Sequence, residues 1–219
     1  MGATRWLLLL LGCLWCGGSP TWAATAYEEL FTGRTLRIDV VHVGTAGEER
    51  YVVHRLMDDG PWPGSTTQLL DPTGRGNNRV SLRQGGRVIY SRGYCTLFGE
   101  WKTTEEAKKG RWRAFQETLR VPYPRGPVTV AIEIRDRHNR FQKIFEHRLN
   151  DPSAILQRGP HRRGVEIISE EVNGPPGEVL DILIVGDGYR EGEREKFIRD
   201  LRYFAGVLFE TSPFKERRK

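Results

Sequence analysis

The sequence predicts a mainly β protein, in which an antiparallel β-sandwich is followed by an incomplete α/β segment of one strand and one helix. Three observations lead to this prediction. Short apolar segments of strand length alternate with turn-forming residues from about residue 35 to about residue 150. A nearly continuous apolar run and an amphipathic helical pattern then follow one another near the C-terminal end. The first 24 residues show the succession of charged, apolar and small residues that is typical of an export signal, so they are not counted as part of the fold.

The composition of the 219-residue chain is that of a globular protein. Hydrophobic residues make up 38% of it and charged residues 28%, which is too little apolar sequence for a polytopic membrane protein. The aromatic share of 10% excludes a disordered chain. The net charge of +6 comes from basic residues that are interleaved with acidic ones along the predicted strands. That interleaving is typical of solvated strand faces, so we expect no nucleic-acid partner.

Residues 1–24 are predicted to be a secretory signal peptide. Arg5 precedes an apolar run over residues 6–16, and glycines and a proline then break the run before the small residues Ala23 and Ala24. Cleavage is expected near these two alanines. The apolar run is too short to cross a bilayer, which takes about 20 apolar residues. We therefore predict a secreted or periplasmic bacterial protein with no transmembrane span.

The cysteines allow an alternative at the N-terminus. Residues 10–13 resemble a lipobox that ends at Cys13, so a lipid anchor through Cys13 is a less favoured alternative to simple cleavage. The three cysteines are too few for a disulfide scaffold, and removal of the signal peptide leaves only Cys95. Cys95 stands in an apolar and aromatic run and is predicted to pack as a small apolar residue.

Residues 25–157 are predicted to form the sandwich domain. Gln84, Gly85 and Gly86 indicate a tight hairpin between two strand segments. Alternation over residues 128–135 directs the apolar residues to a core and leaves Glu133 and Arg135 pointing outward. The predicted strands are residues 36–43, 51–57, 79–83, 87–91, 112–121, 128–135 and 141–147, with a further apolar and aromatic run at 94–101 and a helix-like surface turn at 103–109.

The character of the sequence changes after the sandwich. A basic linker is expected at residues 158–164, and residues 165–219 are expected to belong to a second domain. Within that domain, residues 165–170 alternate weakly and residues 179–185 are predicted to form a strand that is buried on both faces. Apolar residues at helical spacing predict a helix over residues 191–209.

This second domain is expected to be incomplete. A single strand and helix cannot cover their own apolar surface. The chain is therefore expected either to be a fragment of a longer protein or to dock its C-terminal unit on the sandwich. The apolar side chains expected to lack partners are those of Ile182, Ile184, Phe197 and Leu201.

No catalytic or metal-binding constellation occurs in the sequence. A His-Glu-x-x-His motif is absent, and Gly186-Asp187-Gly188 lacks the third glycine of a dinucleotide fingerprint because Glu191 stands in its place. We therefore assign no catalytic, cofactor-binding or metal-binding residue. The histidines, which are expected to be exposed or satisfied, are His42, His54, His138, His147 and His161. The aromatic residues suited to a sugar or peptide platform, for which a place in the core or rim is favoured, are Trp62, Trp101, Trp112 and Tyr123.

Three sequence blocks carry a resemblance to a known family. They are residues 181–189, which include Gly186-Asp187-Gly188-Tyr189, residues 195–205, and residues 212–218 with Pro213-Phe-Lys-Glu-Arg-Arg218. Together they resemble the start of the catalytic domain of the IgA-peptidase-type zinc metallopeptidases, peptidase family M64. The region before them is similar to the N-terminal β-sandwich domain of that family, although this match rests on position and strand pattern alone.

The resemblance implies a function that this chain does not complete. In the family a downstream His-Glu-x-x-His helix binds zinc and supplies the general base, so no zinc ligand is carried over to these residues. We expect the chain to bind no cofactor and to lack peptidase activity, with zinc present only in a full-length parent. The expected partners are the rest of the catalytic domain and a protein or glycan substrate.

The motif block Gly186–Tyr189 is expected to have a structural role. Gly186, Asp187, Gly188 and Tyr189 match the family motif, and we expect them to form a turn that sets the strand-to-helix angle. The function predicted for the chain is that of an exported accessory portion of a zinc metallopeptidase. The alternative is a non-enzymatic secreted β-sandwich module that binds glycan or protein.

Overall fold

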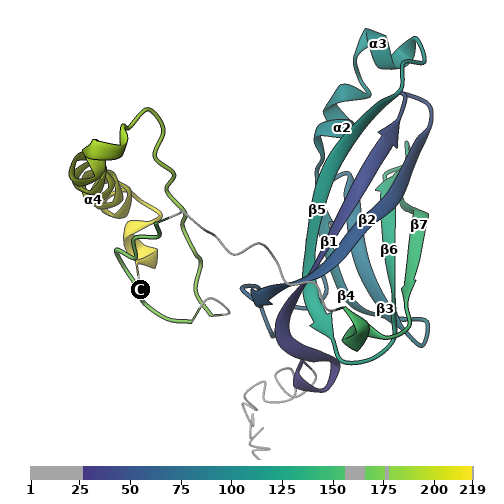
Figure 1. The fold of residues 1–219 in the computed structure, drawn as a ribbon, viewed down its shortest axis with the longest axis horizontal. Coiled ribbons are helices and arrows are strands. Elements are labelled where there is room, and N and C mark those ends of the chain that lie inside the picture. The colour runs from purple at the N-terminus through teal and green to yellow at the C-terminus, as the bar shows by residue number, and fades with distance from the viewer. Residues whose placement is uncertain (1–26, 156–165, 176–177, 219) are drawn as a thin grey trace, which may run out of the picture.

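The computed structural model describes residues 27–155, 166–175 and 178–218 (Figure 1). Its strands form two antiparallel sheets, which confirms the mainly β fold class. The signal peptide, the cleavage region at Ala23 and Ala24, Cys13 and the linker at 158–164 lie outside the described residues. Among the described residues, no helix has both the length and the apolar character needed to cross a bilayer.

The first sheet has three strands in the order β2-β1-β5. They are β1 (Phe31–Gly44), β2 (Glu49–Pro61) and β5 (Arg113–Pro124). The central strand β1 pairs with both neighbours along almost its whole length, with a register shift between Asp39 and Val40 on the β2 side. Because β1 is paired on both sides, it extends beyond the predicted segment at 36–43.

The second sheet has four strands in the order β4-β3-β6-β7. They are β3 (Asn78–Gln84), β4 (Arg87–Tyr94), β6 (Val128–Arg135) and β7 (Phe141–Leu149). The predicted hairpin between β3 and β4 is confirmed. Gly85 and Gly86 have φ angles of +56° and +83°, a left-handed conformation that a two-residue hairpin turn requires at both positions.

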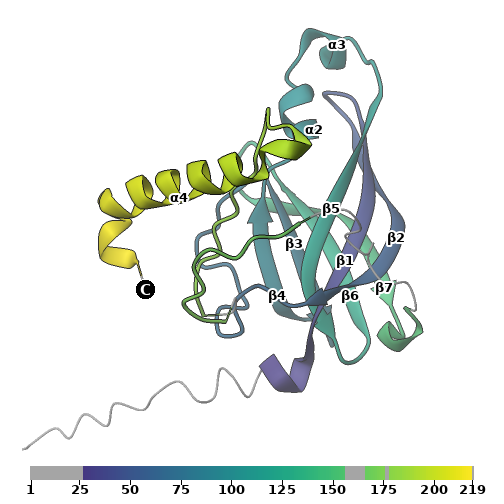
Figure 2. The same ribbon diagram turned by 60° about the vertical axis from the view of Figure 1, so that its left-hand side comes forward.

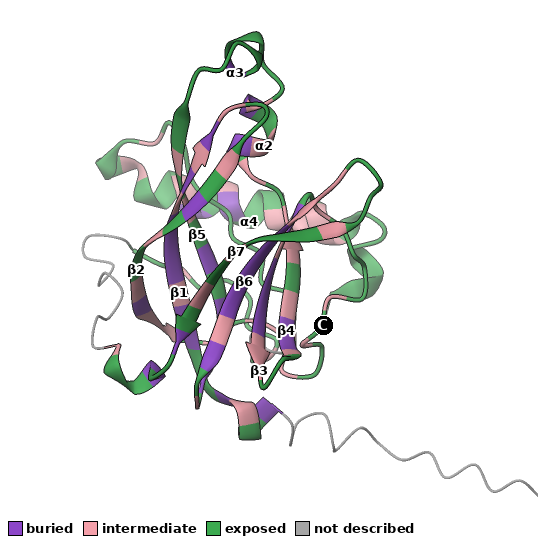
Figure 3. Cartoon of the chain, turned by 90° about the vertical axis from the view of Figure 1, so that its right-hand side faces the viewer, coloured by how far each residue is buried: buried purple, intermediate pink, exposed green. Residues whose placement is uncertain are grey.

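The core lies between the two sheets, where Figure 3 shows the buried residues gathered on the strands. The prediction for β6 is confirmed for its apolar face and for the outward direction of Glu133, which is nevertheless only 5% exposed. Arg79 and Arg83 of β3 extend over this carboxylate and pair with it, so it is covered on the outer face of the sheet. The most deeply buried core side chains include Phe31, Leu36, Ile38, Val40, Leu82, Val121, Val130 and Ile132.

The run at 94–101 forms a helix rather than a strand beyond Tyr94. Helix α2 (Leu97–Trp101) begins after Thr96, whose hydroxyl accepts a hydrogen bond from the backbone N–H of Gly99 over 2.9 Å. Phe98 and Trp101 lie on one face of α2 and are buried there. The prediction that Cys95 packs as an apolar residue is wrong, because it lies exposed in the connection between β4 and this cap.

A second short helix, α3 (Glu105–Lys108), follows and confirms the helix-like turn expected at 103–109. Thr104 caps it by accepting a hydrogen bond from the backbone N–H of Ala107. The sandwich part of the structure ends with the 3-10 turn η1 (Pro152–Ala154).

The C-terminal segment contains η2 (Glu191–Glu193), α4 (Arg194–Glu210) and η3 (Lys215–Arg217). The predicted helix is confirmed, with its first three residues in a 3-10 turn. The strand expected at 179–185 is absent, since no neighbouring strand among the described residues supplies ladder hydrogen bonds to this segment. In Figures 1 and 2, α4 lies to one side of the sandwich.

The expectation of unpartnered apolar residues in this segment holds in part. Ile182 and Ile184 are 48% and 38% exposed, while Phe197 is half-buried. Leu201 is only 9% exposed, so the expectation is wrong for that residue.

Candidate functional site

The family-motif block at Gly186–Tyr189 forms a turn ahead of α4. Gly188 has a φ angle of +78°, and a Cβ atom on Gly186 would lie 2.8 Å from the ring of Phe197. The Tyr189 hydroxyl donates a hydrogen bond over 2.8 Å to Oδ2 of Asp200 on α4. Lys196, one helical turn before Asp200, places its Nζ 4.6 Å from the centre of the Tyr189 ring. These contacts connect the turn to the first part of α4. Asp187 is exposed and takes no part in them.

A hydrogen-bonded group of ionisable side chains lies elsewhere, at one end of the three-stranded sheet. We call it the His42 cluster and define it as His42 on β1, Glu49 on β2, Glu117 on β5 and Lys102 after α2. His42 Nδ1 lies 2.8 Å from Oε1 of Glu117, and Nε2 lies 2.9 Å from Oε2 of Glu49. Lys102 Nζ lies 2.9 Å from the second oxygen of Glu49.

Aromatic rings enclose the imidazole of the His42 cluster. Tyr51 and Phe98 stack on its two faces, each with a centroid distance of 3.9 Å, and His42 has no exposed surface. Burial opposes protonation of His42, but the hydrogen bonds with Glu117 and Glu49 outweigh it and raise the pKa of the imidazole. Burial would raise the pKa of Glu49, but its hydrogen bonds with His42 and Lys102 outweigh that effect and lower it. The cluster is therefore a buried ion network.

The His42 cluster joins three strands and α2, and its enclosure keeps it from acting on an external substrate. Both ring nitrogens of His42 have hydrogen-bond partners, in agreement with the expectation that the histidines are exposed or satisfied. His54 and His138 are exposed, His147 is partly exposed, and His161 lies outside the described residues. Within residues 27–155, 166–175 and 178–218, no three His, Cys, Asp or Glu side chains converge as a metal site would require.

The four aromatic residues considered for a platform do not gather in one place. Trp101 and Tyr123 are buried, and the Tyr123 hydroxyl bonds to the carbonyl of Pro152. Trp112 is 48% exposed beside Arg50. Trp62, by contrast, lines a cavity.

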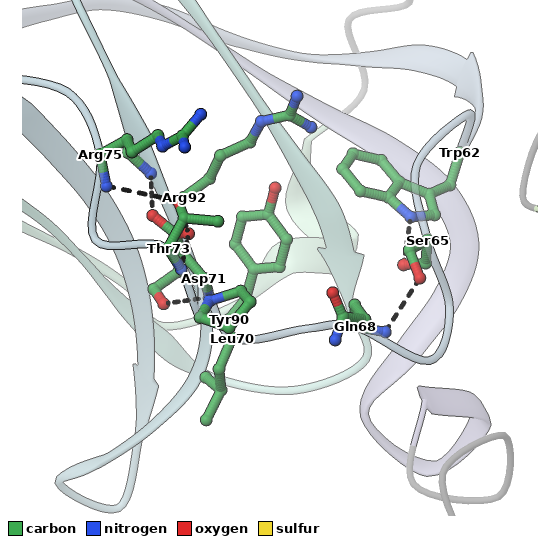
Figure 4. Close-up of a pocket in the computed structure, with 12 residues that line it drawn as sticks. Trp62, Ser65, Gln68, Leu70, Asp71, Thr73, Arg75, Tyr90 and Arg92 are labelled. Carbon is green, nitrogen blue, oxygen red and sulfur yellow. Dashed lines mark hydrogen bonds between the residues drawn. The ribbon is translucent and has the colours of Figure 1, made fainter. Parts of the chain in front are cut away.

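That cavity, which we call the Trp62 pocket, has a volume of about 320 Å³ and lies between β4 and the loop that joins β2 to β3 (Figure 4). Figure 4 shows Trp62, Ser65 and Gln68 on one side of it and Asp71, Thr73 and Arg75 on the other, with Tyr90 between them. The residues that line it are Trp62, Ser65, Gln68, Leu70, Asp71, Pro72, Thr73, Arg75, Tyr90, Ser91, Arg92 and Gly93.

Local hydrogen bonds hold the wall of the Trp62 pocket against β4. Asp71 accepts bonds from the backbone N–H of Thr73 and, through its other oxygen, from that of Gly93. The backbone N–H of Ser91 donates to the carbonyl of Leu69 over 2.9 Å. Hydrogen bonds from Thr73 and from the backbone keep the pKa of Asp71 below its ordinary value. The loop is therefore fixed to the edge of β4 and does not depend on a ligand for its shape.

Two arginines give the Trp62 pocket its charge. Arg75 and Arg92 are exposed, and neither forms an ion pair with any residue that the structure describes. Burial raises the pKa of Tyr90, and the nearby Arg92 opposes that shift, so Tyr90 stays a neutral hydroxyl. The sequence carried a signal for the loop in its turn-forming residues at 71–76, but the meeting of this loop with Tyr90 and Arg92 of β4 depends on tertiary structure.

Two family comparisons cover most of the described chain. Residues 26–146 match the family model described as Peptidase M64 N-terminus, and residues 168–219 match the family model described as IgA Peptidase M64. The first match spans all seven strands up to Glu146, including the His42 cluster and the Trp62 pocket. The second contains the Gly186–Tyr189 turn and α4. No curated protein matches the chain closely enough to count as a relative.

Proposed function

Because the chain belongs to the M64 family of IgA peptidases, we propose that it forms the exported, accessory N-terminal portion of a zinc metallopeptidase. The sandwich precedes the peptidase segment, a position suited to holding a substrate or shielding the peptidase domain. The signal-like pattern of residues 1–24 supports a site of action outside the cytoplasm.

The observation that carries this proposal is the exposed apolar surface of the segment that matches the peptidase. Leu180, Leu183 and Val185 are 86%, 83% and 77% exposed, and Tyr203 and Phe204 of α4 are 67% and 60% exposed. Large apolar side chains exposed in this number within one segment are typical of a surface that contacts protein. We infer that the surface packs against the rest of the peptidase domain.

The described residues of this chain do not fit a zinc ion. The sequence holds no His-Glu-x-x-His motif, and the described residues hold no group of three potential ligands. A zinc peptidase needs the metal to activate its water, so we infer that the chain as given does not hydrolyse peptides. Zinc is then bound only in a full-length parent.

Two measurements on the full chain, expressed in a bacterial host, test the proposal. The mass of the exported protein reports whether the chain is cleaved near Ala23 and Ala24, and casein hydrolysis is followed with and without added zinc. We expect loss of the signal segment and no zinc-dependent hydrolysis. Hydrolysis that depends on zinc and stops on adding a chelator would contradict the inactivity, and retention of residues 1–24 in the cytoplasm would contradict export.

A second candidate function is binding of a glycan or protein by the sandwich itself. The Trp62 pocket favours it, because it combines in a preformed cavity an aromatic side chain, an amide and two arginines that form no ion pair with a described residue. This function is compatible with the first, since a binding site on the accessory domain would bring a substrate to the peptidase.

A further inference from the structure

We propose that the Trp62 pocket binds an acidic sugar, with the carboxylate held by Arg75 and Arg92 and the sugar ring packed against Trp62. This proposal rests on the binding role proposed above for the sandwich and names its ligand class.

The positive charge of two arginines in the Trp62 pocket favours an anionic ligand. Arg75 and Arg92 reach it from two different segments, the β2–β3 loop and β4, and neither has an ion-pair partner among the described residues. Asp71, the one acidic residue of the lining, is already occupied by hydrogen bonds from Thr73 and Gly93. Guanidinium groups bind carboxylates through paired, charge-assisted hydrogen bonds. A carboxylate is thus the group that these two side chains are suited to hold.

The ring of Trp62 supplies an apolar surface beside those charges. It is fixed on two sides, because the Tyr90 ring meets it edge-on at 5.8 Å and the backbone of Gly64 lies so close that a Cβ atom there would be 2.4 Å from the indole. The indole Nε1–H donates to the carbonyl of Ser65 over 3.3 Å. An immobilised indole beside polar groups suits a flat ligand with one apolar face and polar edges, as a sugar ring has.

The edge of β4 argues against an extended peptide as the ligand. A peptide that adds a strand to a sheet needs free backbone groups along the edge strand. Next to the pocket those groups are already used within the chain, because Ser91 N–H donates to Leu69 and Gly93 N–H donates to Asp71. The ligand must therefore be held by side chains. A cavity of about 320 Å³ is near the lower limit for small-molecule sites, which suits a sugar better than a folded protein segment.

The probe we choose is a trisaccharide of galacturonic acid, and its matched control is the same trisaccharide with every carboxyl methyl-esterified. Binding to the full chain is followed by titration calorimetry and by the NMR signal of the Trp62 indole N–H. The variants are Arg75→Gln with Arg92→Gln, and Arg148→Gln as the control. Arg148 is an exposed arginine on β7 that does not line the pocket. Thermal unfolding of each variant shows that it is folded.

We expect the acid to bind with a shift of the Trp62 indole signal, and the ester to bind at least about tenfold more weakly, as loss of charge-assisted hydrogen bonds implies. The double arginine variant should lose affinity by a similar factor while Arg148→Gln keeps it. Equal binding of acid and ester, an equal loss in Arg148→Gln, or a bound acid that leaves the Trp62 signal unmoved would overturn the proposal.

The same titrations separate this proposal from the binding role on which it rests. If the acid does not bind but the neutral ester or a peptide of casein shifts the Trp62 signal, the acidic-sugar proposal fails and the binding role stands. If none of these ligands binds, both fail.

Discussion

The imidazole of His42 on β1 hydrogen-bonds through Nδ1 to Oε1 of Glu117 on β5 over 2.8 Å, across 75 positions of sequence. Glu49 accepts from Nε2 of the same ring. Because ionised carboxylates only accept hydrogen bonds, both ring nitrogens donate and the ring is an imidazolium. His42 has no exposed surface, so its charge is balanced by these two carboxylates rather than by water. The pair therefore ties the central strand of the sheet to its neighbour, and its loss should be felt in stability.

Replacement of His42 by leucine is expected to destabilise the sandwich by about 3–5 kcal/mol. The substitution leaves Glu49 and Glu117 largely buried without their shared cation, and their side chains are each only 12% exposed. Urea unfolding at pH 6 measures the effect. The control is His54→Leu on β2, an exposed site where the change should stay within about 0.5 kcal/mol. Equal losses of unfolding free energy at the two positions would show that the hydrogen bonds of His42 add nothing specific to stability.

The free energy by which the His42 cluster stabilises the fold should pass through a maximum with pH and fall at both lower and higher pH. The pKa of His42 is raised in the folded state, so its contribution is complete below its ordinary value of 6.5 and is lost as the pH rises through the folded value. The pKa of Glu49 is lowered, so its contribution is complete above its ordinary value of 4.5 and is lost as the pH falls through the folded value. The maximum lies between these ordinary values. The measurement is the difference in unfolding free energy between the wild type and His42→Gln from pH 4 to pH 9. A difference that does not change with pH would contradict the imidazolium.

Asp39 should stabilise the outer face of the same sheet against acid. Burial opposes its ionisation, but hydrogen bonds from Arg37, Arg55 and Thr118 outweigh burial and lower its pKa from 3.8 to about 2. A shift of this size is worth about 2 kcal/mol, present above pH 4 and lost as the pH falls toward 2. Asp39→Asn should thus lose most of its stability deficit at pH 2. Thermal melts at pH 5 and pH 2 check this, with Glu29→Gln as the control, at an exposed site that forms no ion pair with a described residue.

Local sequence signals predicted the parts of the fold that depend on few neighbours. Gly85 and Gly86 specify their turn by themselves, and the alternation of Val130 and Ile132 specifies a core face. Alternation also gave the outward direction of Glu133, but not its burial, because that burial depends on Arg79 and Arg83 of another strand. The helix at α2 could have been predicted, since Thr96 is a capping residue three positions before the Gly99 amide that it binds.

The candidate sites depend on tertiary structure, which sequence patterns do not supply. Glu49 and Glu117 come to His42 only when three strands pair in the observed register. In the same way, Trp62 and Arg92 line one pocket because the β2–β3 loop folds over the edge of β4. The predicted strand at 179–185 shows the converse. Its apolar pattern is genuine, but without neighbouring strands the described structure leaves Leu180 and Leu183 exposed.

The exposed apolar residues of the C-terminal segment should make the chain self-associate. Leu180 and Leu183 are 86% and 83% exposed, so replacing both with serine should lower the weight-average sedimentation coefficient at high protein concentration. Val52→Thr on β2, at a position 56% exposed, is the control and should leave association unchanged. Association that persists in the double variant would place the contact elsewhere on the molecule.

The turn before α4 should tolerate no side chain at Gly186. A Cβ atom there would lie 2.8 Å from the ring of Phe197, so Gly186→Ala forces the ring away and should cost about 1–3 kcal/mol of local stability. Hydrogen exchange of the α4 amides measures this loss as faster exchange. Gly192→Ala is the matched control, because nothing lies within 4 Å of a Cβ atom at that position. Unchanged exchange in α4 for Gly192→Ala, with faster exchange for Gly186→Ala, is the expected result for a turn whose glycine is needed for contact with Phe197. Unchanged exchange in Gly186→Ala would show that the turn does not hold α4 in place.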